Sequence, residues 1–236
     1  MTDATQPTRK RFGVLALIFV SVLVNYMDRA NMSVAGTALR EELGLSMVQM
    51  GLVFSAFGWT YSFLQVPGGV MVDLFRTRTL YAVIMCLWSL ATMAQGLAHS
   101  LAMLIGCRMA IGVFQAPSYP ANNKIVTRWF PDGERATAIS IYTSGQFIGL
   151  AVLAPLMVWL QTQLGWRGMI LVTGGAGVFY ALVMYWLYRD PPDHASVNEA
   201  ELNYIREGGG YPDGVKSNAN EAPRGFSWSD LREAFA

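Results

Sequence analysis

Long runs of apolar residues, separated by short polar turns, fill the chain from residue 12 to residue 188. The first run opens as FGVLALIFVSVLVNYM, is interrupted by Asp28 and Arg29, and resumes as ANMSVAGTAL. A helix needs about 20 mostly apolar residues to cross a bilayer. The runs therefore predict an all-α membrane protein, a six-transmembrane-helix bundle with spans at about 12–39, 47–72, 79–98, 101–122, 136–160 and 168–188. No run alternates as a membrane β-barrel strand does, and each is about twice the length of such a strand.

Lys and Arg in the turns predict the orientation of these spans, because positive charge collects on the cytoplasmic side. One side carries Arg40 and Arg167. The other carries nine: Arg9, Lys10, Arg11, Arg76, Arg78, Lys124, Arg128, Arg135 and Arg189. We therefore expect both termini in the cytoplasm, with residues 1–11 as an N-terminal tail and 12–189 as the bundle. The first span is too long for a signal peptide and lacks a small-residue cleavage site, so we expect it to be retained.

From residue 190 the composition becomes polar. PPDH stops the sixth helix, because proline does not continue a helix. VNEAELNYIRE predicts a short surface helix, and GGGYPDG ends it. Residues 190–236 are thus expected to form a cytoplasmic segment with no further span.

Composition excludes several function classes. Hydrophobic residues make up 53% and charged residues 14%, against about 25% charged in soluble proteins. Seventeen Lys and Arg against sixteen Asp and Glu give a charge of +1, which favours no nucleic-acid partner. Cys86 and Cys107 lie in apolar runs, and the two histidines, His99 and His194, lie outside the spans. We expect no enzyme activity, no metal and no cofactor.

Three charged residues stand inside the predicted spans: Asp28, Arg29 and Arg108. A charge at mid-bilayer costs at least about 2.5 kcal/mol, so it needs a partner or water. Adjacent helix residues point about 100° apart, so Asp28 does not face Arg29. At about 1.5 Å per residue, Asp28 and Arg108 lie at similar depth, and we expect them to pair. Arg29 then has no anionic partner in the protein, and the parallel N–H groups of its guanidinium suit the two oxygens of a carboxylate. A static triad of the three charges is the alternative.

Neutral polar residues accompany these charges. Tyr26, Tyr61, Gln115 and Gln146 stand within the spans and could contact hydroxyl groups. The alternative for each is an ordinary hydrogen bond between helices, worth about 0.6 kcal/mol. Pro117 and Pro120 are expected to bend the fourth helix.

The turn after the second span reads GVMVDLFRTR, from Gly69 to Arg78. It resembles the motif G-x-x-x-D-R-x-G-x-R of the major facilitator superfamily, with matches at Gly69, Asp73 and Arg78. Leu74 stands at the motif's first Arg and Arg76 at its second Gly. The resemblance implies the N-terminal half of that fold, in which this turn takes part in gating.

Three stretches of the sequence resemble the anion–cation symporters, most closely the bacterial D-galactonate/proton symporters. They are NYMDRANMSVA, CRMAIGVFQAPSYPANNKIVTRWFP and ERATAISIYTSGQFIGL. The resemblance implies import of a sugar-acid anion with protons across the inner membrane, by alternating access and driven by the proton gradient. It implies that Asp28 is a protonation site tied to Arg108. It further implies that Arg29 binds the substrate carboxylate while Tyr26, Tyr61 and Gln146 contact its hydroxyls.

Two features depart from this family. Gln115 stands where the family has Glu, and glutamine does not titrate, so we expect altered proton stoichiometry. The family has twelve helices, whereas this sequence stops in the central loop before a seventh, as a fragment, a truncated reading frame or half of a split gene would. The missing C-terminal six-helix half is the implied partner. Open alternatives are a related hexuronate, glucarate or aromatic carboxylate carrier, a sensor, and a non-transporting truncated product.

Overall fold

Helices make up almost all of the regular structure in residues 6–214, the part of the chain that the computed structural model describes. That range contains no β-strand. The elements are α1 (Lys10–Leu43), α2 (Met47–Leu74), α3 (Thr77–Gly96), α4 (Leu101–Gln115), α5 (Ser118–Trp129), α6 (Asp132–Leu187), the 3₁₀ turn η1 (Pro191–Asp193) and α7 (Glu199–Glu207). The predicted all-α class is confirmed, and α7 lies where the sequence predicts a short surface helix.

Polar residues in the short turns start several of these helices. Ser46 accepts a hydrogen bond from the backbone N–H of Gln49, whose side chain in turn accepts from the N–H of Ser46. Ser100 caps α4 by accepting a hydrogen bond from the backbone N–H of Met103. Such caps satisfy N–H groups that lack partners in the first turn. The serines thus define where α2 and α4 begin.

The fourth predicted span ends later than expected. We predicted an end near Asn122, whereas after a break at Ala116 and Pro117 the helix continues as α5 to Trp129. The helix therefore extends into the stretch from residue 123 onward that the sequence pattern assigns to a connection. Asn122 accepts a hydrogen bond from Tyr81 at 2.8 Å and Asn123 one from Tyr142 at 2.7 Å, so both amides have partners inside the bundle.

The helix α6 is 56 residues long and consists of two segments joined at Gly165. Gly165 has φ 69° and ψ 172°, a conformation that residues with a side chain rarely adopt. The kink divides α6 into residues 132–164 and 166–187, which match the fifth and sixth predicted runs. With α4 and α5 taken as one bent rod, the described residues thus form six long helical segments.

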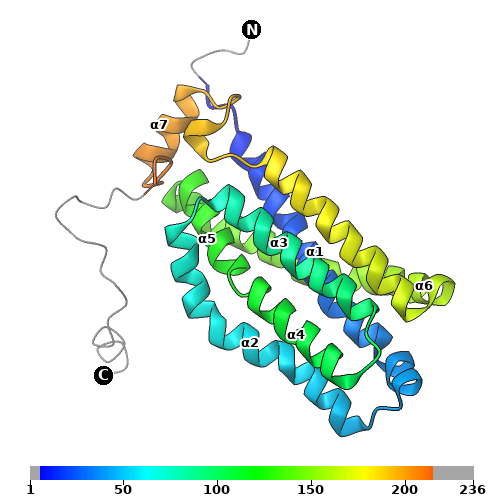
Figure 1. Cartoon of the computed structure of the whole chain (residues 1–236). Helices are drawn as coiled ribbons and strands as arrows, with labels where there is room; N and C mark the ends of the chain where they lie inside the picture. The colour runs from blue at the N-terminus through cyan, green and yellow to red at the C-terminus, as the bar shows by residue number, and fades with distance from the viewer. Residues whose placement is uncertain (1–5, 215–236) are drawn as a thin grey trace.

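The long helices lie side by side, with α7 at the end of the bundle where α1 begins (Figure 1). Helix α1 packs chiefly against α6, α2 against α4, and α3 against both α4 and α6. One apolar cluster, which includes Ile18, Trp88 and Trp129, fills the half nearer α7. A second, which includes Leu39 and Trp166, fills the other half. Asp28 and Arg29 of α1 lie at the level where the first cluster gives way to the second.

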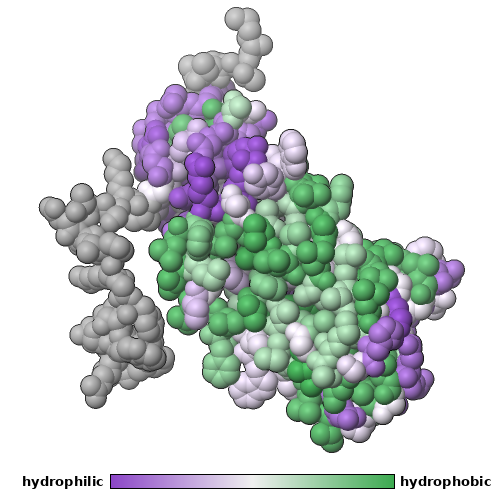
Figure 2. All heavy atoms as spheres, in the orientation of Figure 1, coloured by the Kyte–Doolittle hydropathy of each residue, from purple (hydrophilic) through white to green (hydrophobic). Residues whose placement is uncertain are grey.

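The outer surface of the bundle is strongly apolar. Trp59, Phe63, Phe147, Phe179 and Trp186 are among many large apolar side chains that stay exposed. Figure 2 shows this apolar belt below a polar cap around the α7 end. Soluble proteins rarely expose so much contiguous apolar area, whereas a bilayer accommodates it.

Four helical stretches of the described residues are long and apolar enough to cross a membrane: Lys10–Leu43, Thr77–Gly96, Leu101–Trp129 and the double-length Asp132–Leu187. Helix α2 is not among them, although its 28 residues would extend about 42 Å. The protein is an all-helical, multi-pass membrane protein.

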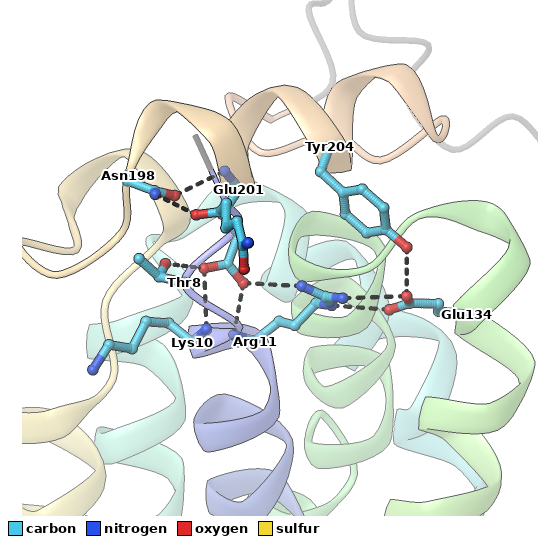
Figure 3. Close-up of polar contacts among 8 residues, drawn as sticks. Thr8, Lys10, Arg11, Glu134, Asn198, Glu201 and Tyr204 are labelled. Atoms are coloured by element: carbon cyan, nitrogen blue, oxygen red, sulfur yellow. Dashed lines mark hydrogen bonds and ion pairs between the residues drawn. The ribbon is translucent and has the colours of Figure 1, made fainter. Parts of the chain in front are cut away.

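The segment after α6 folds back onto the bundle rather than leaving it. The buried carboxylate of Glu201 on α7 accepts hydrogen bonds from the Thr8 hydroxyl, from the backbone N–H groups of Lys10 and Arg11 at 3.0 and 3.2 Å, and from Arg11 Nη1 at 3.3 Å (Figure 3). The helix α1 has no capping side chain of its own, because Arg9 at its N-cap position makes no such bond. Glu201 therefore caps α1 from 190 residues away.

Arg11 extends this contact to α6. Its Nε donates to Glu134 at 2.9 Å, and Tyr204 on α7 donates its hydroxyl to the same carboxylate at 2.7 Å (Figure 3). The backbone after α7 also binds the start of α6, because the N–H of Asp132 donates to the carbonyl of Gly208 at 2.7 Å. We call this set of contacts the α7 clasp. It joins the beginnings of α1 and α6.

Candidate functional site

Three aromatic rings surround the guanidinium of Arg29 on α1. Its central carbon lies 4.8 Å from the ring centre of Tyr26, 5.0 Å from Phe57 and 4.9 Å from Tyr61. Phe57 and Tyr61 are one turn apart on α2, and their rings stack at 5.4 Å. The ring faces attract the cation and contribute up to about 2 kcal/mol each when water is excluded. They hold Arg29 between α1 and α2 without neutralising its charge.

The guanidinium of Arg29 keeps hydrogen-bonding capacity. Its Nε and Nη2 are enclosed and have no hydrogen-bond partner among residues 6–214. Enclosed charged donors without partners are costly, so they usually serve a ligand or another specific purpose. The role predicted for Arg29 as an anion-binding residue stays a prediction.

Asp28 and Arg108 lie near each other but form no salt bridge within the described residues. Both side chains are buried and attract each other electrostatically. The Nε of Arg108 nevertheless lacks a hydrogen-bond partner among residues 6–214, and the polar side chains that approach the Asp28 carboxylate are those of Trp88 and Thr92. The guanidinium of Arg108 lies instead 4.9 Å from the centre of the Phe57 ring. The expected direct ion pair is therefore absent from this structure, because Arg108 is stacked on α2 instead of bonded to α1.

Phe57 thus contacts both arginines, and it was not among the predicted site residues. A phenylalanine in an apolar run has no polar group that would distinguish it from its neighbours, so the sequence pattern alone does not single it out. The one available signal is the spacing of Phe57 and Tyr61, which places both rings on one face of α2. The guanidinium groups of Arg29 and Arg108, which repel each other, therefore both lie against this one ring.

Two predicted polar residues meet beside Arg29. Tyr26 on α1 donates its hydroxyl to Oε1 of Gln146 on α6 at 2.7 Å. This bond leaves the amide Nε2 of Gln146 free to donate elsewhere, since an amide side chain has both an acceptor and donors. Tyr26, Arg29, Tyr61 and Gln146, predicted on three different spans, are therefore brought to one place.

Gln115 lies at the break between α4 and α5 and is fully buried. Neither its side-chain nitrogen nor its side-chain oxygen has a partner in the described residues. Its backbone carbonyl accepts a hydrogen bond from the Ser118 hydroxyl at 2.7 Å. Asn25 of α1 donates to that same hydroxyl at 3.4 Å. Polar groups thus continue from Arg29 towards the α7 end of the bundle.

The turn-motif residues lie at that end, apart from Arg29. Gly69 and Asp73 line a cavity of about 740 Å³ together with Lys124 and Arg128. Arg78 donates from Nε to the backbone carbonyl of Tyr185 at 2.7 Å and stacks on its ring at 4.2 Å. The motif's last arginine thus ties the start of α3 to the end of α6, while Asp73 stays exposed beside the cavity.

No group of three or more His, Cys, Asp or Glu within residues 6–214 could hold a metal ion. The polar groups gathered around Arg29 are a second arginine, one carboxylate, and neutral hydroxyl and amide groups.

Comparison with known proteins identifies the family. The sequence profile of the Major Facilitator Superfamily matches residues 18–235, which is most of the chain. The chain belongs to the major facilitator superfamily. As a facilitator-family protein it is a transporter homologue and not an enzyme.

Among the curated relatives of this facilitator-family chain, the D-galactonate transporter of Escherichia coli O6:H1 is 44% identical over 233 residues, which cover 99% of this chain and 54% of that protein. The "Probable galactarate/D-glucarate transporter GudP" of Bacillus subtilis is 38% identical over 216 residues, covering 89% of this chain and 48% of the relative. The chain spans about half the length of these relatives.

A solved structure agrees with the fold. The crystal structure of a bacterial homolog to the human lysosomal transporter Spinster, inward-facing and occupied, matches with a TM-score of 0.68 and 26% identity. The match covers 77% of this chain and 45% of that one. The facilitator-family chain thus has the helical architecture of about half of a solved transporter.

Proposed function

We propose that this chain is the N-terminal half of a secondary transporter that imports a sugar-acid anion, similar to D-galactonate, together with protons by alternating access. Arg29 binds the carboxylate of the substrate. Tyr26, Tyr61 and Gln146 contact its hydroxyls. Six membrane spans, cytoplasmic termini and a bacterial inner-membrane location belong to the same proposal.

The observation that carries this proposal is the environment of Arg29. Its guanidinium is enclosed by three rings, has two unpartnered nitrogens and has no bonded carboxylate within residues 6–214. One carboxylate and two arginines within reach of one another sum to +1, from −1 and +2. A substrate carboxylate offers the two oxygens that an Arg fork binds well. The hydroxyls and amide around it are neutral, as a polyol chain requires.

Coupling to protons is assigned to Asp28. Its carboxylate is buried and senses the charge of Arg108. Protonation of Asp28 removes the one negative charge beside the two arginines. The site then becomes more positive, which favours binding of an anion. Gln115 does not titrate, so this half provides one proton carrier at this site rather than two.

Alternating access places the substrate between two six-helix halves. The second half would close over the exposed apolar face of this one, and the turn at Gly69, Asp73 and Arg78 would take part in gating on the cytoplasmic side. The curated relatives are about twice as long as this chain, which fits this arrangement.

The experiment reconstitutes the protein at its native length in liposomes and measures uptake of labelled D-galactonate under an inward proton gradient. Asp28→Asn is expected to abolish accumulation against the gradient. It should retain exchange of labelled for unlabelled substrate, because exchange needs no net proton movement. Asp193→Asn, an exposed aspartate beyond α6, is the matched control and should behave as wild type.

If Asp28→Asn accumulates substrate as wild type does, the coupling role is wrong. If the wild-type protein neither takes up nor binds any sugar acid, the transport proposal is wrong and a non-transporting product is the better reading.

A related anion as substrate is the second candidate. The similarity to a galactarate/D-glucarate transporter, at 38% identity, favours testing sugar diacids beside D-galactonate. Hexuronates and aromatic carboxylates complete the competition panel. The competitor with the lowest inhibition constant identifies the substrate class.

A further inference from the structure

The ring of Phe57 on α2 is shared by two arginines that come from different helices. The central carbon of the Arg29 guanidinium on α1 lies 5.0 Å from the ring centre, and that of Arg108 on α4 lies 4.9 Å from it. Phe57 and Arg108 are only 8% and 5% exposed. Like charges repel each other most strongly where water is excluded, so the approach of two arginines to one ring needs a compensating attraction.

Neighbouring groups fix the position of this ring. Tyr61, one turn further along α2, stacks on it with ring centres 5.4 Å apart and planes 22° from parallel. The backbone of Phe57 lies directly against α4, because a Cβ added at Gly112 would be 2.7 Å from the carbonyl oxygen of Phe57. Gly112 follows Arg108 by one helical turn, so this close approach brings Phe57 next to the part of α4 that carries Arg108.

A ring holds a guanidinium in a different way from a carboxylate. The ring face attracts the positive charge and forms no hydrogen bonds with the N–H groups around the guanidinium plane. A carboxylate instead accepts those N–H groups in two parallel hydrogen bonds and cancels the charge. Nε and Nη2 of Arg29 and Nε of Arg108 have no hydrogen-bond partner among residues 6–214. Phe57 thus contacts both arginines while their charge and these donors stay available to an anion.

We propose that Phe57 is a positioning residue of the anion site, and that the electron-rich face of its ring orients the guanidinium groups of Arg29 and Arg108 for the substrate carboxylate. The proposal rests on the proposed function and deepens it, because it explains why Arg108 stacks on α2 instead of forming a salt bridge with Asp28. It assigns the effect to the charge distribution of the ring, since an aliphatic side chain of similar size would fill the same space without attracting either cation.

The test measures equilibrium binding of labelled D-galactonate to the native-length protein in lipid nanodiscs. Phe57 is replaced, by suppression of a stop codon, with phenylalanines that carry one, two or three fluorine atoms on the ring. Each fluorine withdraws electrons from the ring face and weakens its attraction for a cation, while the shape of the ring changes little. The Kd should rise with each fluorine and reach about tenfold with three, the ratio expected when most of one desolvated cation–π contact is lost.

Two variants and one further measurement serve as controls. The same fluorine series at Phe63, an exposed residue of α2 that stacks on Trp59, should leave the Kd at its wild-type value. Phe57→Leu, which removes the ring, should weaken binding at least as much as three fluorines do. The melting temperature reports on packing separately, and it should stay unchanged along the fluorine series because the shape of the side chain is kept.

The same Kd for all four rings at position 57 overturns the proposal, whether or not Phe57→Leu weakens binding, because the ring would then act only by its size. A fall in melting temperature that parallels the rise in Kd also overturns it, because the effect would then be one of packing. If Arg29→Lys weakens binding in either case, the proposed function stands without this role of Phe57. Absence of D-galactonate binding by the wild-type protein overturns both proposals.

Discussion

The α7 clasp gives a sharp test of how this bundle is held together. Glu201 is fully buried and accepts from the backbone N–H groups of Lys10 and Arg11, from Arg11 Nη1 and from Thr8. Glu201→Ala removes all four acceptor contacts at once. It leaves the start of α1 without any capping side chain, because Arg9 supplies none.

The expected cost follows from these contacts. Loss of an N-cap costs about 1 kcal/mol. Loss of a hydrogen bond between charged groups costs about 1.5 kcal/mol or somewhat more. Arg11 keeps its bonds to Glu134 at 2.9 and 3.3 Å, so the change avoids the roughly 3–5 kcal/mol of an unpaired buried charge. The free energy of unfolding should therefore fall by about 2–3 kcal/mol.

The assay is reversible unfolding of the 236-residue chain in mixed micelles, followed by tryptophan fluorescence, since the chain has seven tryptophans. Hydrogen exchange of the peptide that begins α1 gives the local readout, and its amides should exchange faster in Glu201→Ala. Glu207→Ala is the control, because Glu207 is an exposed residue of the same helix. Equal stability of the two variants would refute the reasoning. So would a loss of stability with unchanged exchange at the start of α1.

The remaining predictions concern helix packing and pH. Gly112→Ala should destabilise the protein by about 1–3 kcal/mol in the same unfolding assay, because its Cβ would lie 2.7 Å from the carbonyl oxygen of Phe57; Gly106→Ala, with open space around it on the same helix, should be neutral or slightly stabilising. The hydrogen bond to Glu134 raises the pKa of Tyr204, so its neutral form is favoured in the folded protein. The stabilisation that this hydrogen bond gives to the folded protein is present below about pH 10 and is lost as pH rises through the raised pKa of Tyr204. Wild type should therefore melt at a higher temperature than Tyr204→Phe at neutral pH, and this difference should disappear in strong alkali.

The long helices could be predicted because apolar runs of membrane length have few alternative structures. The continuation of this helix beyond Asn122 could not be predicted, because Asn123 resembles a loop residue until its partner Tyr142 is known. The capping of α1 by Glu201 is equally invisible in sequence. It joins residues about 190 positions apart, and Glu201 is one of several acids in a polar stretch.

Much of the candidate site was predictable from one physical fact, the cost of charge in a bilayer. That cost singles out Asp28, Arg29 and Arg108. Helix depth placed Asp28 and Arg108 at one level, but depth does not determine where a flexible arginine points, and Arg108 stacks on Phe57 instead. An aromatic residue such as Phe57 is inconspicuous within an apolar run, so its place beside Arg29 emerges only from the way α2 lies beside α1.

The central claim is that Arg29 binds the carboxylate of a sugar acid. The most direct measurement is equilibrium binding of labelled D-galactonate to the native-length protein in lipid nanodiscs, for wild type, Arg29→Lys and the control Arg40→Lys, which lies at the far end of α1. Saturable binding should weaken at least about tenfold in Arg29→Lys alone, because lysine lacks the planar fork. The neutral sugar D-galactose should not compete. Equal affinity in Arg29→Lys, or displacement by D-galactose as effective as by D-galactonate, would contradict the claim.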